Sequence, residues 1–235
     1  MYKKAETIIS VLKNLREIKT LDIEVFRSIV EDPDLFNLLT TKGYNDSVEQ
    51  RITFDSESVL QISLVALEYG ADVEEVCKLL SWKEFEAFSK SVLEKNNYFC
   101  IQNFRFKHNQ KRYEIDVVGF KKPLILCIDS KHYKKSGRSN VLRTYCKKQI
   151  ERIEALSKVL PEMVSKLRLI EWKEAKIIPL IVTLLAEDID FSEGVPVIPF
   201  FKLNNFIVEL PAHISEVHQI HTKFPKYTRL EDYRA

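Results

Sequence analysis

Two aspartates and a lysine stand inside two strongly apolar stretches of the chain. Asp116 lies in RYEIDVVGF, and Asp129 and Lys131 lie in PLILCIDSK, with twelve residues between the two aspartates. Paired carboxylates in an apolar sheet repel each other and are costly to desolvate unless a cation or a base offsets their charge. Mg²⁺ prefers such oxygen ligands, and a neighbouring lysine can hold the attacking water or stabilise charge on phosphorus. These residues therefore predict metal-assisted hydrolysis of a phosphate ester.

A purely structural interpretation competes with this one. Both aspartates can sit at strand ends in water, with Lys131 only pairing with Asp129, because structural ion pairs resemble active sites. Two helical positions favour the site. Glu86 lies inside the apolar stripe of a helix that starts near Ser81, and a nearby metal ion with its bound waters would explain a carboxylate at such a position. Gln149 lies in the apolar stripe of a later helix, where its amide can bridge a water or a phosphate. Each of the two, taken singly, also fits a boundary position.

Cations gather directly after the second stretch. Residues 131–152 contain only one acid, Glu151, among many basic residues. The loop SKHYKKSGRSN leads into a helix N-terminus and suits phosphate contact beside a metal site, although a charge run is more often a solvated face. The residues that we expect to contact DNA are Tyr133, Lys134, Lys135, Arg138, Arg143, Lys147 and Lys148.

Strand geometry explains how these residues come together. Successive side chains of a strand point to opposite faces, so Asp129 and Lys131 share a face with Ile125 and Cys127. The short connection GFKKP makes the two stretches a plausible antiparallel pair. We therefore expect Asp116 to lie close to Asp129.

The surrounding elements alternate between strands and helices. Strands are predicted near 98–106, 112–120, 123–131 and 176–185, with a long helix over about 139–159, while VPVIPFF and NNFIVEL fit either short strands or a loop and a helix. Residues 1–80 show helical periodicity with Gly43 and Gly70 as stops, and Ser81 with Glu84 forms a capping-box pattern. The fold class is therefore α/β, a central mixed sheet flanked by helices over residues 81–235, after a small all-helical domain at 1–80.

Composition limits the remaining possibilities. The chain has 235 residues with 45% hydrophobic residues, enough for a large core. Its four cysteines lack CxxC spacing, which argues for reduced, mostly buried thiols rather than zinc or iron–sulfur ligation. No run of eighteen apolar residues occurs, and the start MYKKAETIISVLKNLREIKT breaks into charge early, so we expect a cytoplasmic protein with no membrane contact.

Charge is divided unevenly along the chain. Residues 1–80 hold 9 Lys and Arg against 15 Asp and Glu, whereas residues 81–235 hold 27 against 19. A basic part suits a polyanion and an acidic part is repelled by one. We therefore expect residues 1–80 to serve protein contact, dimerisation or regulation rather than DNA binding.

EIDVVG, the twelve-residue spacing and DSK together resemble the signature of the PD-(D/E)XK nuclease superfamily. WKEFEAFSKSVLEKNNY is similar to the first helix of its restriction-endonuclease-like branch, notably the Mrr-type and archaeal Holliday-junction-resolvase-like members. The resemblance covers roughly residues 80–185, although Asp129 stands where Glu is commoner. It implies that Glu86, Asp116, Asp129, Lys131 and Gln149 form the catalytic set.

The same resemblance implies a cofactor and partners. Mg²⁺ or Mn²⁺ would be held by Asp116, Asp129 and the Ser130 carbonyl, with Glu86 at the metal shell and Lys131 at the attacking water. DNA is the expected substrate and a homodimer the expected assembly, in a restriction, junction-resolving or repair role that these residues do not separate. The alternatives are a catalytically inactive module that binds DNA or protein, and a hydrolase of another phosphate ester.

Overall fold

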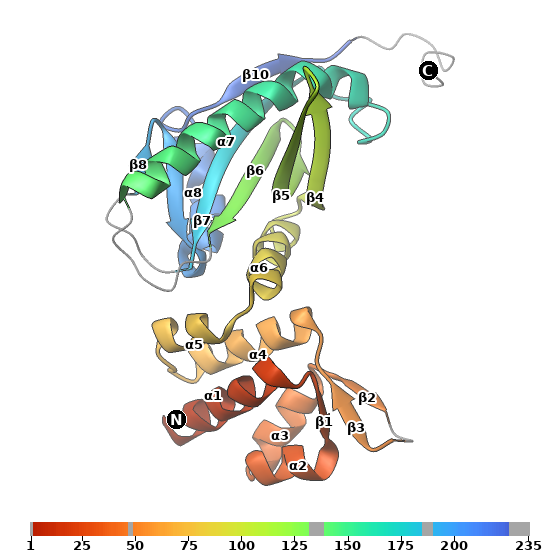
Figure 1. Cartoon of the computed structure of the whole chain (residues 1–235), viewed down its shortest axis with the longest axis vertical. Coiled ribbons are helices and arrows are strands. Elements are labelled where there is room, and N and C mark those ends of the chain that lie inside the picture. The colour runs from red at the N-terminus through yellow and green to blue at the C-terminus, as the bar shows by residue number, and fades with distance from the viewer. Residues whose placement is uncertain (1, 47–48, 132–138, 185–189, 226–235) are drawn as a thin grey trace. The chain divides into compact units, whose positions relative to one another are not determined.

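The computed structural model describes the whole chain except residues 1, 47–48, 132–138, 185–189 and 226–235 (Figure 1). It divides into two compact units, residues 1–88 and 89–235, and the division falls inside helix α6 (Trp82–Lys95). The domains expected from the sequence, 1–80 and 81–235, remain a prediction. Within the described residues, every helix is too short or too polar to span a bilayer.

The first unit is mainly helical. Its helices are α1 (Tyr2–Glu17), α2 (Ile23–Ile29), α3 (Pro33–Thr40), α4 (Ser56–Glu68), α5 (Val73–Leu79) and the first half of α6. Phe26 packs between Phe36 and Phe54, with ring centroids 5.4 and 5.5 Å apart. Gly70 ends α4 with φ +88°, a backbone conformation that glycine adopts without steric cost, which confirms the predicted stop.

Each of the helices α2 to α5 begins with an aspartate cap. The side chains of Asp22, Asp32, Asp55 and Asp72 accept backbone N–H groups of the first turn that follows. Such caps satisfy N–H groups that no helical carbonyl can reach and place negative charge at the positive end of the helix dipole. Some of the acidic residues in 1–80 therefore serve as helix caps.

The expected all-helical character of this unit needs a correction. The strands β1 (Thr20–Asp22), β2 (Tyr44–Asp46) and β3 (Arg51–Thr53) form a small antiparallel sheet in the order β1-β3-β2. Each has three residues, which is too short for an alternating pattern to stand out from the helical periodicity around it.

The second unit is built on a mixed sheet, as the sequence predicts, and this sheet has seven strands. The path is β4-β5-β6-β7-β9-β8, with β10 paired to β7. Its strands are β4 (Phe99–His108), β5 (Lys111–Lys121), β6 (Leu124–Lys131), β7 (Glu174–Thr183), β8 (Phe191–Ser192), β9 (Val195–Pro199) and β10 (Ile220–Lys223). β4, β5 and β6 are antiparallel neighbours, whereas β6, β7 and β9 run parallel.

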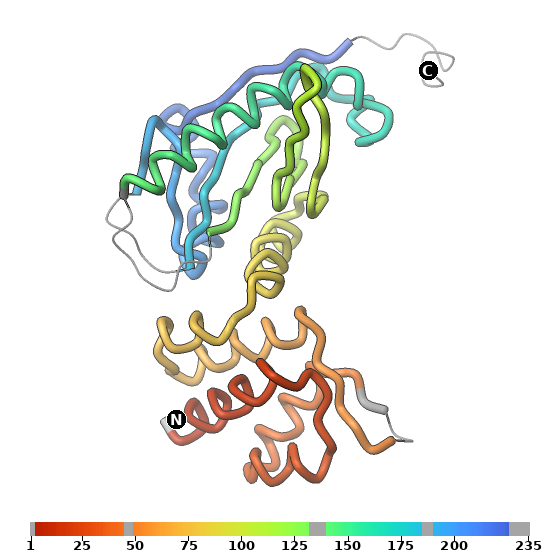
Figure 2. The backbone as a smooth tube through the Cα atoms, in the orientation of Figure 1, coloured from red at the N-terminus to blue at the C-terminus, as the bar shows by residue number. Residues whose placement is uncertain are grey.

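Helix α7 (Ser139–Val159) connects the parallel strands β6 and β7 and packs on one face of the sheet (Figures 1 and 2). Its residues Ile153 and Leu156 share a buried core with Ile125 and Cys127 of β6. Helix α8 (Leu203–His213) packs against β9. A parallel strand pair needs a long crossover, and α7 supplies it while covering the apolar face of the sheet.

Candidate functional site

The two aspartates meet where regular strand pairing stops. The register of β5 with β6 runs from Lys121↔Leu124 to Val117↔Ile128, and Asp116 and Asp129 are the next positions. There the Asp116 Oδ2 accepts the backbone N–H of Ser130 at 2.7 Å. A side-chain carboxylate thus bonds an N–H group just past the end of the strand pairing, and it links the two strands at this end.

The pairing of β5 with β4 is also interrupted at Asp116. β4 pairs Gln102 with Val117 and Phe104 with Ile115, but not Asn103 with Asp116, and Asn103 has φ +50°. A residue with a side chain rarely adopts that conformation unless its surroundings enforce it. Asp116 therefore lies where the ladder is interrupted on both sides, which leaves its carboxylate less constrained by regular sheet geometry.

Asp129 is a buried carboxylate between two cations. It is 2% exposed, its Oδ1 accepts a bond from Arg152 Nη1 at 2.7 Å, and its Oδ2 forms an ion pair with Lys131. Burial of a charge is costly unless partners offset it, which explains why both cations converge here. Within the described residues, Oδ2 nevertheless has no hydrogen bond of acceptable geometry. That oxygen remains a candidate cation ligand.

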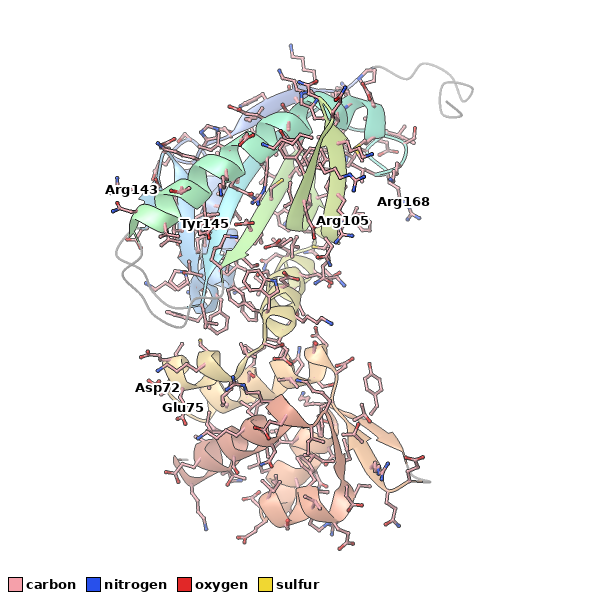
Figure 3. The ribbon with its side chains drawn as sticks, viewed as in Figure 1. Asp72, Glu75, Arg105, Arg143, Tyr145 and Arg168 are labelled. Carbon is pink, nitrogen blue, oxygen red and sulfur yellow. The ribbon has the colours of Figure 1, made fainter. Side chains whose placement is uncertain are left out.

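Lys131 ends β6 in a largely enclosed position. Its side chain is 12% exposed, and its ammonium lies 4.5 Å from the ring centroid of Tyr145 on α7. Figure 3 shows Tyr145 projecting from that helix. The face of an aromatic ring attracts a cation, so Tyr145 and Asp129 together fix the ammonium. Asp129 and Lys131 lie on the same face of β6, as strand alternation predicts.

Gln149 ties α7 to the sheet. Its amide is fully buried, and Nε2 donates to the Cys127 carbonyl at 2.8 Å while Oε1 accepts from Arg152 Nη1 at 3.0 Å. The sequence suggested contact with a water or a phosphate. In the structure both ends of the amide have protein partners, and this arrangement can position Asp129 through Arg152.

Sequence reasoning did not assign Arg152 and Tyr145 to the site. Arg152 ends the basic stretch 131–152, which the sequence indicates only as a face for phosphate or solvent. Yet it stands three residues after Gln149, and residues three or four apart share a helix face, as Tyr145 and Gln149 also do. An arginine in that stripe was therefore readable as a partner for a buried acid.

Glu86 belongs to the first compact unit, whereas the residues above belong to the second. Its side chain is 8% exposed, and Oε1 accepts a bond from Trp82 Nε1 one turn earlier on α6. Its neighbour Glu84 completes the predicted capping box, because Oε2 accepts the N–H of Ser81 at 2.6 Å. The assignment of Glu86 to a metal shell stays a prediction.

The structure describes only some of the residues that are predicted to contact phosphate. Tyr133, Lys134, Lys135 and Arg138 lie outside the described residues. Arg143, Lys147 and Lys148 lie on α7 and are exposed, and Lys147 forms an ion pair with Glu193 at 3.3 Å. Figure 3 shows Arg143 near the start of the same helix.

The site can be tested for its fit to a metal ion. In the described parts of the chain, no group of three or more His, Cys, Asp and Glu side chains gathers in a metal-binding arrangement. Asp116 and Asp129 are adjacent positions at the end of the β5–β6 pairing, and the Asp129 Oδ2, which pairs with Lys131, has no hydrogen bond within the described residues. An oxygen-only set of this kind fits a hard cation that keeps several waters.

The cysteines take no part in this donor set. All four are free, and Cys77, Cys127 and Cys146 are buried. Burial raises the pKa of the Cys146 thiol to about 11 and that of Cys77 to about 12. Thiols with raised pKa values stay protonated at neutral pH and are poor metal ligands and nucleophiles.

Comparison with known proteins places these residues in a nuclease context. Residues 81–183 match the NERD family model, described as a nuclease-related domain. An uncharacterized protein of Archaeoglobus fulgidus is 28% identical over 138 residues, which is 58% of this chain and 97% of the relative. The crystal structure of protein VC1899 from Vibrio cholerae aligns with 91% of this chain and 51% of its own length, at 14% identity and a TM-score of 0.34. The chain thus spans about half of that protein.

Proposed function

We propose that this protein is a metal-dependent DNA endonuclease of the PD-(D/E)XK type that hydrolyses phosphodiester bonds. The observation that carries the proposal is that Asp116 bonds the Ser130 N–H beside the Asp129–Lys131 ion pair, at the end of β5 and β6 and inside the segment that matches a nuclease-related domain. Arg143, Lys147 and Lys148, with Tyr133, Lys134, Lys135 and Arg138, are the proposed contacts to DNA phosphates. A homodimer, and protein contact through residues 1–80, belong to the same proposal.

Each side chain has a separate role in this mechanism. Asp116, Asp129 and the Ser130 carbonyl would hold Mg²⁺ or Mn²⁺, with Glu86 at its water shell; when bound, the ion supplies Lewis-acid activation of the phosphate and of water. Lys131 orients the attacking water and stabilises charge that develops on the phosphate. Gln149 and Arg152 keep the Asp129 carboxylate in place, and Tyr145 confines the Lys131 ammonium.

One observation favours a second candidate, a nuclease-like module that binds DNA or protein without cutting. Lys131 and Arg152 already neutralise Asp129 without any metal ion. A carboxylate satisfied by protein cations does not require a divalent ion to be stable in the interior.

A cleavage assay separates the two candidates. The purified protein would be incubated with plasmid, linear duplex, single-stranded and four-way-junction DNA, each with Mg²⁺, Mn²⁺ or EDTA. Asp116→Ala and Asp129→Ala should abolish cutting and leave DNA binding intact, because they remove metal ligands but not the cation surface. Glu114→Ala, an exposed carboxylate on the same strand, is the matched control and should cut normally.

The outcomes point in opposite directions. Metal-dependent cutting that is lost in both aspartate variants supports the nuclease, and the preferred substrate separates resolvase from restriction or repair roles. Cutting that survives in both variants would mean that the site is assigned wrongly. Tight DNA binding without cutting on any substrate would favour the inactive module.

A further inference from the structure

Two positive charges face each other across the β4–β5 hairpin. Lys107 and Arg112 are paired positions in the register, and both side chains are exposed. In the part of the chain that the structure describes, neither side chain forms an ion pair or a hydrogen bond. Like charges directly opposite each other destabilise a strand pair. An anion bound between them would offset this repulsion.

The hairpin holds this pair on a rigid support. On its other face Phe106 and Tyr113 stack with ring centroids 5.2 Å apart and pack against the core of the unit. On the exposed face Arg105 is already paired with Glu114, with Nε 2.9 Å from the carboxylate. A pocket of about 500 Å³ lies along these residues. Lys107 and Arg112 are therefore the two cations of this face that remain available to a partner.

We propose that Lys107 and Arg112, on the exposed face of this hairpin, bind the phosphate backbone of duplex DNA. The inference rests on the proposed function and adds to it a contact surface on an element that precedes the site in the chain. A phosphate between Lys107 and Arg112 relieves their repulsion, and the guanidinium of Arg112 matches phosphate geometry. Contacts of this kind position DNA without reading its sequence.

The spacing to the site favours a nucleic acid over a small anion. Arg112 precedes Asp116 by four residues on β5, which is about 13 Å along a strand. A DNA strand advances about 3.4 Å per nucleotide, so the interval corresponds to about four nucleotides. Tyr113 and Ile115 point into the core, and Arg112 and Glu114 alternate to the other side. A backbone of several phosphates can span this interval, whereas a small anion cannot.

The test measures the salt dependence of DNA binding in EDTA, where no cutting occurs. A fluorescent duplex would be titrated with the full chain and with Lys107→Gln/Arg112→Gln between about 50 and 200 mM salt. Loss of two phosphate contacts should make the slope of log K against log salt shallower by about 1.8. Affinity near 0.1 M salt should fall about 10- to 100-fold.

Two control variants show whether the effect depends on where the charges lie or only on how many are removed. Lys202→Gln/Lys223→Gln removes two exposed cations elsewhere in the same unit and should leave the slope unchanged. Arg105→Gln/Glu114→Gln removes an ion pair without changing the net charge and should do the same. The melting temperature of Lys107→Gln/Arg112→Gln should be equal to or above that of the parent, because like-charge repulsion is relieved.

The result separates this inference from the proposed nuclease function. Hairpin-dependent binding without cutting of any DNA would keep the inference and overturn the nuclease. Cutting with an unchanged salt slope in Lys107→Gln/Arg112→Gln would do the reverse. Absence of duplex binding at about 50 mM salt overturns the inference, as does a hairpin effect on binding of polyglutamate that exceeds the effect on DNA.

Discussion

The same three groups, a lysine, a carboxylate and a tyrosine, come together twice between the sheet and α7. In one trio Lys131 pairs with Asp129 and lies 4.5 Å from the ring centroid of Tyr145. In the other Lys111 pairs with Glu151 and lies 5.0 Å from the ring centroid of Tyr113. The parts are distributed differently: α7 contributes the tyrosine to the first trio and the acid to the second.

Burial separates the two trios. The side chains of Lys131 and Asp129 are 12% and 3% exposed, whereas those of Lys111 and Glu151 are 56% and 52% exposed. In water an ion pair contributes little, because solvent screens the charges and the long side chains lose freedom. In the interior the loss of one partner leaves a charge that water cannot reach. Only the buried trio is expected to matter for both chemistry and stability.

The largest expected difference concerns catalysis. At saturating DNA, Lys131→Met should slow cutting by about 10²- to 10⁴-fold, because it removes the group proposed to orient the attacking water. Lys111→Met should cut like the parent. Single-turnover rates of the two variants provide the measurement, and equal rates would break the comparison and the assignment of Lys131.

Stability should differ next. Arg152→Met leaves the Asp129 carboxylate with Lys131 alone and should lower the free energy of unfolding by about 3 kcal/mol. Glu151→Gln, one residue earlier on α7, breaks the exposed pair and should not change it measurably. Urea denaturation of both variants is the test; a similar loss in each would mean that burial is not what distinguishes the trios.

A buried acid outside the proposed site sharpens the comparison. Glu84 is 1% exposed, pairs with Lys19 at 2.5 Å and caps α6. Glu84→Ala should cost about 2 kcal/mol in the free energy of unfolding, through the lost cap and the unpaired partner. Cutting by the folded variant should stay at the parental rate. If cutting disappears as well, loss of activity is no guide to the catalytic set.

The smallest effect concerns the titration of the exposed trio. A side-chain bond from Lys111 lowers the pKa of Glu151, and the same bond raises the pKa of Lys111. A lowered carboxyl pKa stabilises the fold above the ordinary value near 4.5, and that gain is lost as the pH falls through the folded value. Carboxyl NMR titration should show Glu151 below its ordinary value, and Lys111→Met or 1 M salt should restore it.

Much of this arrangement follows from local patterns in the sequence. Strand alternation and the short GFKKP connection were enough to predict that Asp116 meets β6 near Asp129, and the Asp116 bond to Ser130 N–H agrees with that. The predicted helix over 139–159 matches α7, Ser139–Val159, and the capping box at Ser81 and Glu84 is present. These features depend on residues close together in the chain, where periodicity and spacing carry the information.

What the sequence left open depends on distant contacts. The bond between Arg152 and Asp129 joins a helix to a strand across 23 positions, and although the spacing places Arg152 on the helix face of Gln149, it does not identify the acid that Arg152 meets. The interruption of pairing at Asn103 and Asp116 is set by three strands together. The three-residue strands of the first unit form only because their partners complete the ladder.

The aspartate caps of α2 to α5 constrain how the first unit can be redesigned. A library that neutralises its surface acids, for example to test whether acidity keeps residues 1–80 away from DNA, will treat all acids alike unless these positions are excluded. Asp22, Asp32, Asp55 and Asp72 should be kept or replaced only by Ser, Thr or Asn, which accept the same N–H bonds. The remaining surface acids of residues 1–80 then become independent variables, and the net charge of this segment can be changed without removing a helix cap.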